Sequence, residues 1–153
     1  MIKLNDEVFY FLNKQGYVIV STLDADGYIH NSCKGIVKID KAGKIYLFDL
    51  YQKQTLENIK RENRISITMV DEHKFAGYCL KGRALVVDRG GLTPDIIQAW
   101  EEKIISRITQ RMFKNIHGES GHPRHPEAAF PTPQYLILME VDAVIDLTPA
   151  HLK

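Results

Sequence analysis

The sequence predicts a mainly β fold of the α+β type, in which about six strands close into an antiparallel barrel with flanking helices. Segments rich in β-branched and aromatic residues recur along the chain, as strands require. Short turns that contain glycine, at residues 24–27 and 40–43, separate several of these segments, which is typical of hairpins. Strands joined by hairpins favour a closed antiparallel barrel over a parallel sheet.

Six segments are predicted as strands from their composition and alternation. The third shows the alternation most clearly, because Ile45, Leu47 and Asp49 fall on one face and the residues between them fall on the other. The second is expected to be irregular near residues 32–35. The predicted strands are residues 17–23, 28–39, 44–50, 64–70, 78–87 and 134–147.

Helices are predicted at the N-terminus and between strands. Asn5 can cap a first helix whose acidic first turn suits the positive end of the helix dipole, and Gly16 can end it. Residues 55–62 are predicted as a short helix that points Leu56 and Ile59 inward.

A longer helix is expected after Thr93, which can cap it, with Pro94 at its first position. Residues 115–133, rich in histidine, proline and glycine, are predicted as a polar loop. One apolar stripe is expected along the long helix, formed by Ile97, Trp100, Ile104, Ile108 and Met112.

Composition limits the class of protein. With 153 residues, 44% of them apolar and 25% charged, a single soluble domain over residues 1–153 is expected. A net charge of +1 gives no strong field to attract nucleic acid or an anionic membrane. Without a long apolar run or a signal-peptide pattern, a cytoplasmic location is expected. Cys33 and Cys79 are expected to be free thiols.

A polar loop lies between the third strand and the short helix. It contains Lys53, Gln54 and Thr55, so a positive charge and a hydroxyl are expected beside the free N–H groups at a helix N-terminus. These are the groups that bind a phosphate. The alternative is a solvated loop in which Thr55 is an ordinary N-cap, and the residues alone leave both interpretations open.

The second strand contains Asn31, Ser32 and Lys34. Alternation favours a solvent-facing position for Ser32 and Lys34, whereas Asn31 shares its side of the strand with apolar residues. Gly35 suits either the close approach of a ligand or a bulge. The apolar residues that share the side of Asn31 are Ile29, Cys33, Val37 and Ile39.

A histidine-rich segment contains His117, His122, His125 and Glu127, which are residue types that bind zinc or iron. Prolines between them prevent a helical two-histidine site, so we expect a polar loop without a metal. The segment could also serve as a lid over a ligand. The sequence contains no paired-carboxylate pattern and no nucleotide-binding glycine motif, and it assigns no catalytic residue.

Four segments, taken in order, resemble the FMN-binding split-barrel family of pyridoxamine 5′-phosphate oxidase. They are the opening strand (residues 16–22), the turn and second strand (26–32), the phosphate loop with its helix and the next strand (53–67), and the following strand (80–84). The chain is most similar to the small flavin-binding or flavin-reductase-like relatives.

This resemblance implies a homodimer with FMN in a groove at the subunit interface. The phosphate would lie near Lys53 and Thr55, facing Ser32 or Lys34, and the isoalloxazine ring would lie along the third strand with Asn31 near its polar edge. The residues implied in FMN binding are Asn31, Ser32, Lys34, Phe48, Asp49, Leu50, Lys53, Gln54 and Thr55.

The resemblance implies an oxidoreductase that passes hydride or electrons between a reduced nicotinamide and a small acceptor. In such proteins the cofactor carries the chemistry. The sequence leaves open whether the chain is an enzyme. The alternatives are a non-catalytic flavin carrier or sensor, a haem-binding split-barrel protein that uses a histidine from residues 117–125, and a barrel scaffold for a protein partner.

Overall fold

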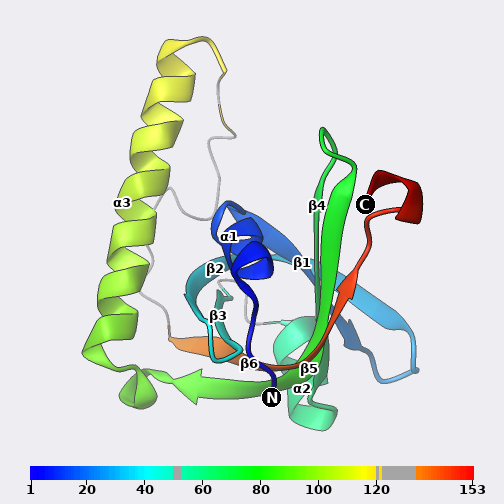
Figure 1. Ribbon diagram of the computed structural model, residues 1–153. Helices are drawn as coiled ribbons and strands as arrows, with labels where there is room; N and C mark the ends of the chain where they lie inside the picture. The colour runs from blue at the N-terminus through cyan, green and yellow to red at the C-terminus, as the bar shows by residue number, and fades with distance from the viewer. Residues whose placement is uncertain (50–52, 120, 122–133) are drawn as a thin grey trace.

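The computed structural model describes residues 1–49, 53–119, 121 and 134–153, and Figure 1 shows the path of the chain. Two short 3₁₀ turns, η1 (Arg89–Gly91) and η3 (Ala150–Leu152), accompany the longer elements. In chain order these are α1 (Asp6–Asn13), β1 (Tyr17–Leu23), β2 (Ile29–Asp40), β3 (Lys44–Phe48), α2 (Gln54–Arg61), β4 (Arg64–Asp71), β5 (Ala76–Asp88), α3 (Pro94–Ile116) and β6 (Tyr135–Asp146).

The strands form a closed barrel in the order β1-β2-β3-β6-β5-β4. Each neighbouring pair is antiparallel, and the pairing of β1 with β4 closes the ring. The predicted antiparallel barrel is therefore confirmed. Among the helices in the described part of the chain, none has the length and apolar character needed to cross a membrane.

The barrel interior is filled by alternate residues of the strands. In β1, for example, Val18 and Val20 are buried while Ile19 between them is 43% exposed. Two helices complete the core at opposite ends of the barrel, as Figure 1 shows. Leu12 of α1 is fully buried at one end, and Ile59 of α2 is 4% exposed at the other.

The third helix packs against the outside of the barrel. Ile96 of α3 joins a second apolar cluster with Val37 and Phe48, and Figure 1 shows that the C-terminal end of the helix extends beyond the strands. Of the predicted apolar stripe, Ile104 is buried, whereas Ile97 is 42% exposed and Met112 is 61% exposed. Periodicity identified a helix but could not show how much of it the barrel covers.

The local turn signals were interpreted correctly. Gly27 and Gly43 have φ values of 83° and 97°, which glycine adopts without strain. The side chain of Asn5 accepts a hydrogen bond from the Val8 backbone N–H, as expected of an N-cap. The irregularity in β2 was placed too early, because the register shifts between Ile36 and Lys38.

Candidate functional site

Two hydroxyls from distant parts of the sequence meet at the start of α2. The Oγ atom of Ser32 in β2 lies 3.0 Å from the Oγ1 atom of Thr55. Thr55 is only 3% exposed and lies inside the first turn of the helix, so the alternative interpretation of Thr55 as the N-cap is wrong. The structure thus brings together two of the residues that the sequence singled out.

The N-cap position of α2 is occupied by Lys53, whose side chain makes no capping hydrogen bond. Its carbonyl accepts hydrogen bonds from the N–H groups of Leu56 and Glu57. Among the described residues, the N–H groups of Gln54 and Thr55 have no acceptor, which is the usual state of an uncapped helix N-terminus. Two backbone donors are therefore available beside the hydroxyl pair.

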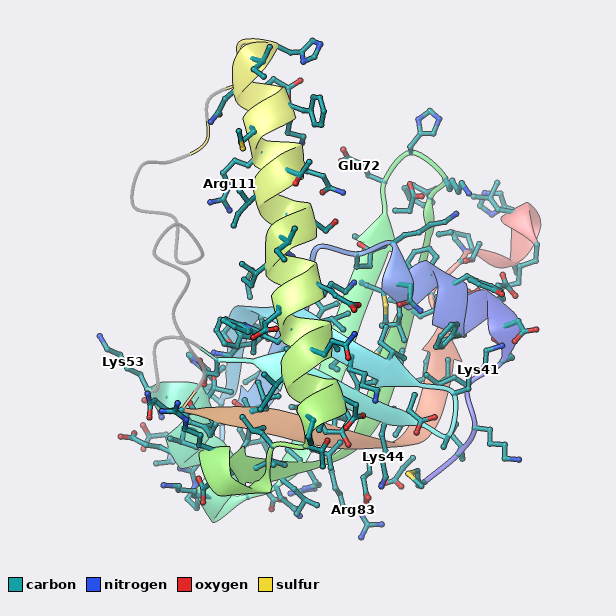
Figure 2. All side chains as sticks on the ribbon, turned by 90° about the vertical axis from the view of Figure 1, so that its left-hand side faces the viewer. Lys41, Lys44, Lys53, Glu72, Arg83 and Arg111 are labelled. Atoms are coloured by element: carbon teal, nitrogen blue, oxygen red, sulfur yellow. The ribbon has the colours of Figure 1, made fainter. Side chains whose placement is uncertain are left out.

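Lys53 itself lies on the surface and points outward, away from the barrel (Figure 2). Within the described residues its ammonium group has no carboxylate partner. The side chain is long and unrestrained, so it can turn toward an anion held at the helix N-terminus.

A buried ionic network lies next to this region. The Nζ atom of Lys34 donates to Oδ1 of Asp49 at 2.6 Å, and the hydroxyl of Tyr135 donates to Oδ2 of the same carboxylate at 2.7 Å. All three residues are buried, with exposed fractions of 8%, 3% and 5%. Burial and then the hydrogen bond to Asp49 raise the pKa of Tyr135 above its usual range.

The side-chain directions along β2 differ from the solvent-facing interpretation. Lys34 pairs with Val18 of β1 and shares its inward direction, whereas Ile29 on the other side is 70% exposed. Alternation alone separates the two faces of β2 but does not show which face points into the barrel. Asn31 is exposed on the outer side, where its Oδ1 atom accepts from Ser21 Oγ at 2.7 Å. The structure therefore does not gather Asn31 with the inward-facing site residues.

The remaining predicted residues are distributed around the network. Phe48 is 6% exposed, and its ring lies 6.0 Å from that of Trp100 in α3. Gln54 donates from Nε2 to Oδ1 of Asn58 at 2.8 Å. Leu50 lies outside the described residues.

Sequence reasoning missed a polar contact between α2 and β1. Asn58 is fully buried and donates from Nδ2 to Oγ1 of Thr22 at 3.0 Å. The available signal was its position three residues after Thr55, which places both on the same face of the helix. Such a buried pair fixes the orientation of α2 against the barrel and with it the direction of the helix N-terminus.

No group of three or more metal-ligating side chains occurs among the residues that the structure describes. His117 lies at the exposed C-terminal end of α3, with its Nδ1 atom 2.7 Å from the carbonyl oxygen of Phe113. His122, His125 and Glu127 lie outside the described residues. Cys33 and Cys79 are free thiols.

Two hollows lie among the described residues, and the smaller one is beside Phe48. A groove of about 810 Å³ runs over the outer surface of β1, β4 and β5 beyond the C-terminal end of α2. A smaller one of about 260 Å³ lies between α3 and the start of β6 and includes Trp100.

Solved structures with the same fold include HupZ from Group A Streptococcus, with a TM-score of 0.64 and 19% identity over 95% of this chain and 94% of that one. A Clostridium acetobutylicum protein related to general stress protein 26, of the pyridoxinephosphate oxidase family, has a TM-score of 0.58 and 18% identity, covering 96% and 95% of the two chains. The heme storage protein HutZ from Vibrio cholerae has a TM-score of 0.54 and 15% identity, covering 94% of each chain.

These similarities concern the fold alone. No curated protein matches the chain. A family model described as pyridoxamine 5′-phosphate oxidase matches residues 4–130, which cover most of the chain and include residues 53–55 and the first five strands. The chain belongs to the pyridoxamine 5′-phosphate oxidase family.

Proposed function

We propose that the protein binds FMN with its phosphate at the N-terminus of α2 and that it is a flavin-dependent oxidoreductase. The observation that carries the proposal is the contact between Ser32 and Thr55 beside the uncapped start of that helix. It places hydroxyls, free backbone N–H groups and the positive end of a helix dipole at one point.

The donor set suits a phosphate monoester. In the contact between Ser32 and Thr55 only one hydroxyl donates, so the other hydroxyl proton remains available. The N–H groups of Gln54 and Thr55 add two donors, and Lys53 adds a positive charge that is free of partners among the described residues. Lys34 is less suited to this role, because Asp49 already neutralises its charge.

The ring of the cofactor would lie along the end of β3, near Phe48 and Asp49. There the buried ion pair between Asp49 and Lys34, together with the hydroxyl of Tyr135, fixes the end of the strand. Bound FMN supplies the capacity to accept and pass on hydride or single electrons, and the polypeptide orients it and excludes water. The electron partner in this proposal is a reduced nicotinamide or another small molecule.

A homodimer is part of the proposal. Tyr17 and Ile19 on the outer face of β1 are 67% and 43% exposed, and Tyr28 in the following turn is 74% exposed. An apolar surface of this kind on a barrel is a reasonable contact for a second copy. Light scattering coupled to size-exclusion chromatography tests it, and a monomer at micromolar concentration would contradict it.

The decisive experiment is the visible absorption spectrum of the purified protein before and after addition of FMN, FAD and haem. We expect a flavin spectrum that denaturation releases as FMN. A protein that remains colourless with FMN would exclude the proposal. Stopped-flow mixing of the flavin-loaded protein with NADH and NADPH then separates a reductase from a carrier or sensor, because a carrier leaves the flavin oxidised.

One observation favours haem binding as a second candidate function. The carbonyl oxygen of Phe113 holds the Nδ1 side of His117, which leaves Nε2 free in the tautomer that binds iron. Phe113 and Ile116 beside it are 61% and 76% exposed and offer an apolar surface. A Soret band on haem addition that disappears in His117→Ala would support this function, and an unchanged band would remove His117 from it.

A further inference from the structure

The groove of about 810 Å³ has the size of a small-molecule site, for which 300–1,000 Å³ is usual. It lies on the outer face of β1, β4 and β5 and is independent of the residues proposed for FMN. The two places are at opposite ends of α2, because Thr55 lies in the first turn and Glu62 follows the last. Eight helical residues separate points by about 12 Å.

Two arginines face each other across neighbouring strands in this groove. Arg64 of β4 and Arg83 of β5 are direct cross-strand partners, and Lys81 lies two pairs further along on the same face, opposite Ser66. Like charges at directly opposed positions destabilise a sheet. Glu62 and Asp142 offset the two arginines, whereas Lys81 has no ion-pair partner among the described residues, and a bound anion would balance it.

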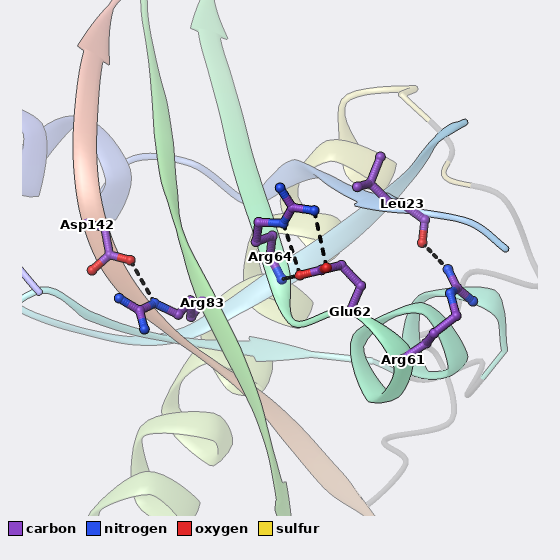
Figure 3. Close-up of polar contacts among 6 residues, drawn as sticks. All are labelled: Leu23, Arg61, Glu62, Arg64, Arg83 and Asp142. Atoms are coloured by element: carbon purple, nitrogen blue, oxygen red, sulfur yellow. Dashed lines mark hydrogen bonds and ion pairs between the residues drawn. The ribbon is translucent and has the colours of Figure 1, made fainter. Parts of the chain in front are cut away.

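Acidic neighbours hold the two guanidinium groups without using all of their donors. Glu62 accepts from Nε and Nη2 of Arg64 at 3.0 and 3.2 Å, and Asp142 accepts from Nε of Arg83 at 3.2 Å (Figure 3). Within the described residues, Nη1 of Arg64 and both terminal nitrogens of Arg83 remain without an acceptor, and Lys81 has no ion-pair partner.

An irregularity in the sheet creates this arrangement. Lys81 pairs with Ala143 and Gly82 pairs with Val141, so Asp142 is an extra residue in β6. Such a bulge redirects a side chain, and bulges are common near binding sites. Here it places the carboxylate of Asp142 against Arg83 and so orients the guanidinium beside the groove.

The groove also has apolar residues. Its lining includes Leu23, Ile29 and Ile65, together with Ser21 and Ser66. Ile29 is 70% exposed and so contributes accessible apolar surface to the groove. A ligand for this surface has an anionic group at one end and an apolar body at the other.

We propose that this groove binds a small phosphorylated organic molecule, with its phosphate at Arg64, Lys81 and Arg83 and an apolar, planar body over Leu23 and Ile29. A phosphate suits the site because its three oxygens match the donors that remain on Arg64, Lys81 and Arg83 beside the ion pairs with Glu62 and Asp142.

Amide NMR titration of the full chain with phenyl phosphate tests the proposal, with inorganic phosphate and benzyl alcohol as separate probes. We expect saturable shifts at residues 62–66 and 81–83 with phenyl phosphate, weaker binding of inorganic phosphate and no binding of benzyl alcohol. Arg83→Gln and Lys81→Gln should each weaken phenyl phosphate binding about tenfold, the effect of one charged contact. Lys60→Gln, which removes an exposed charge from α2 outside the groove, should leave it unchanged.

Absence of saturable shifts in the groove would overturn the proposal. So would a loss of phenyl phosphate affinity in Lys60→Gln as large as that in Arg83→Gln, because it would indicate attraction by overall charge alone. A change of oligomeric state in Arg83→Gln with unaltered phenyl phosphate binding would assign the surface to a second copy instead. The titration is repeated with excess FMN and in Lys53→Ala. Groove shifts that persist without any FMN binding would leave this inference intact while the proposed function fails.

Discussion

Lys34 and Asp49 form an ion pair that is almost completely removed from water, with side-chain exposed fractions of 9% and 1% and a distance of 2.6 Å between Nζ and Oδ1. Burial of two charges is costly unless each is paired and hydrogen-bonded, and Tyr135 supplies the additional hydrogen bond to the carboxylate. The network ties β2, the end of β3 and the start of β6 together. It therefore stabilises the segment from which the chain leads to α2.

Asp49→Asn should lower the free energy of unfolding by about 3–5 kcal/mol, the usual cost of leaving the other member of a buried pair without its partner. Urea unfolding followed by circular dichroism measures it. The matched control is Asp95→Asn, which breaks the more exposed ion pair with Lys38 and should have a much smaller effect on the free energy of unfolding. Similar losses of unfolding free energy in the two variants would mean that burial of the Lys34–Asp49 pair does not increase the cost of breaking it.

Stability should fall as the pH rises above 10, because two tyrosines keep their protons in the folded state. Burial raises the pKa of Tyr78 to about 12, with a further contribution from Glu7, and burial and Asp49 raise the pKa of Tyr135. Unfolded tyrosine titrates near pH 10. Between that pH and the folded-state pKa the unfolded state binds fewer protons, so the free energy of unfolding decreases with pH.

Tyr135→Phe and Tyr78→Phe should each flatten this decrease, as measured by urea unfolding at pH 8, 9, 10 and 11. Tyr28→Phe, at an exposed position, serves as the control and should follow the unmodified protein. A decrease that is equally steep in all variants would show that other groups cause the alkaline loss of stability.

The strands and turns could be predicted because their signals are local. The segment 17–23 was predicted with the same bounds as β1. Gly27 and Gly43, which have positive φ values, indicate the turns of the first two hairpins. The helix predicted at residues 55–62 starts and ends one residue earlier, since helix ends depend on which groups satisfy the terminal N–H and carbonyl groups.

The candidate site was less predictable, because its contacts join residues far apart in the sequence. Tyr135 and Asp49 are separated by 86 positions and meet because β6 lies between β3 and β5 in the barrel. The inward direction of Lys34 is equally non-local, since it depends on the register of β2 against β1. The position of Asn58 three residues after Thr55 suggests a shared helix face, but nothing in the sequence indicates that Thr22 is its hydrogen-bond partner.

Gly82→Ala should destabilise the protein by at least about 1–3 kcal/mol, the usual cost of overpacking in a core. A Cβ atom at this position would lie 2.0 Å from the carbonyl oxygen of Glu140, so the backbone at the bulge would have to move. Gly90→Ala is the control, because no atom lies within 4 Å of its added methyl group. Thermal and urea unfolding should separate the two variants, and equal stability would show that β6 relaxes freely around the bulge.

Lys53→Ala should weaken FMN binding by about 1–3 kcal/mol, the range for a lost charge-assisted contact, with little effect on folding because the side chain is exposed. Ser32→Ala should also weaken it, since it removes one of the two hydroxyls at the start of α2. Fluorescence titration with FMN measures both, and Lys60→Ala at the other end of the helix is the control for charge. If Lys53→Ala binds FMN as tightly as Lys60→Ala does, Lys53 does not contact the phosphate. The backbone N–H groups and the hydroxyls must then bind the phosphate alone.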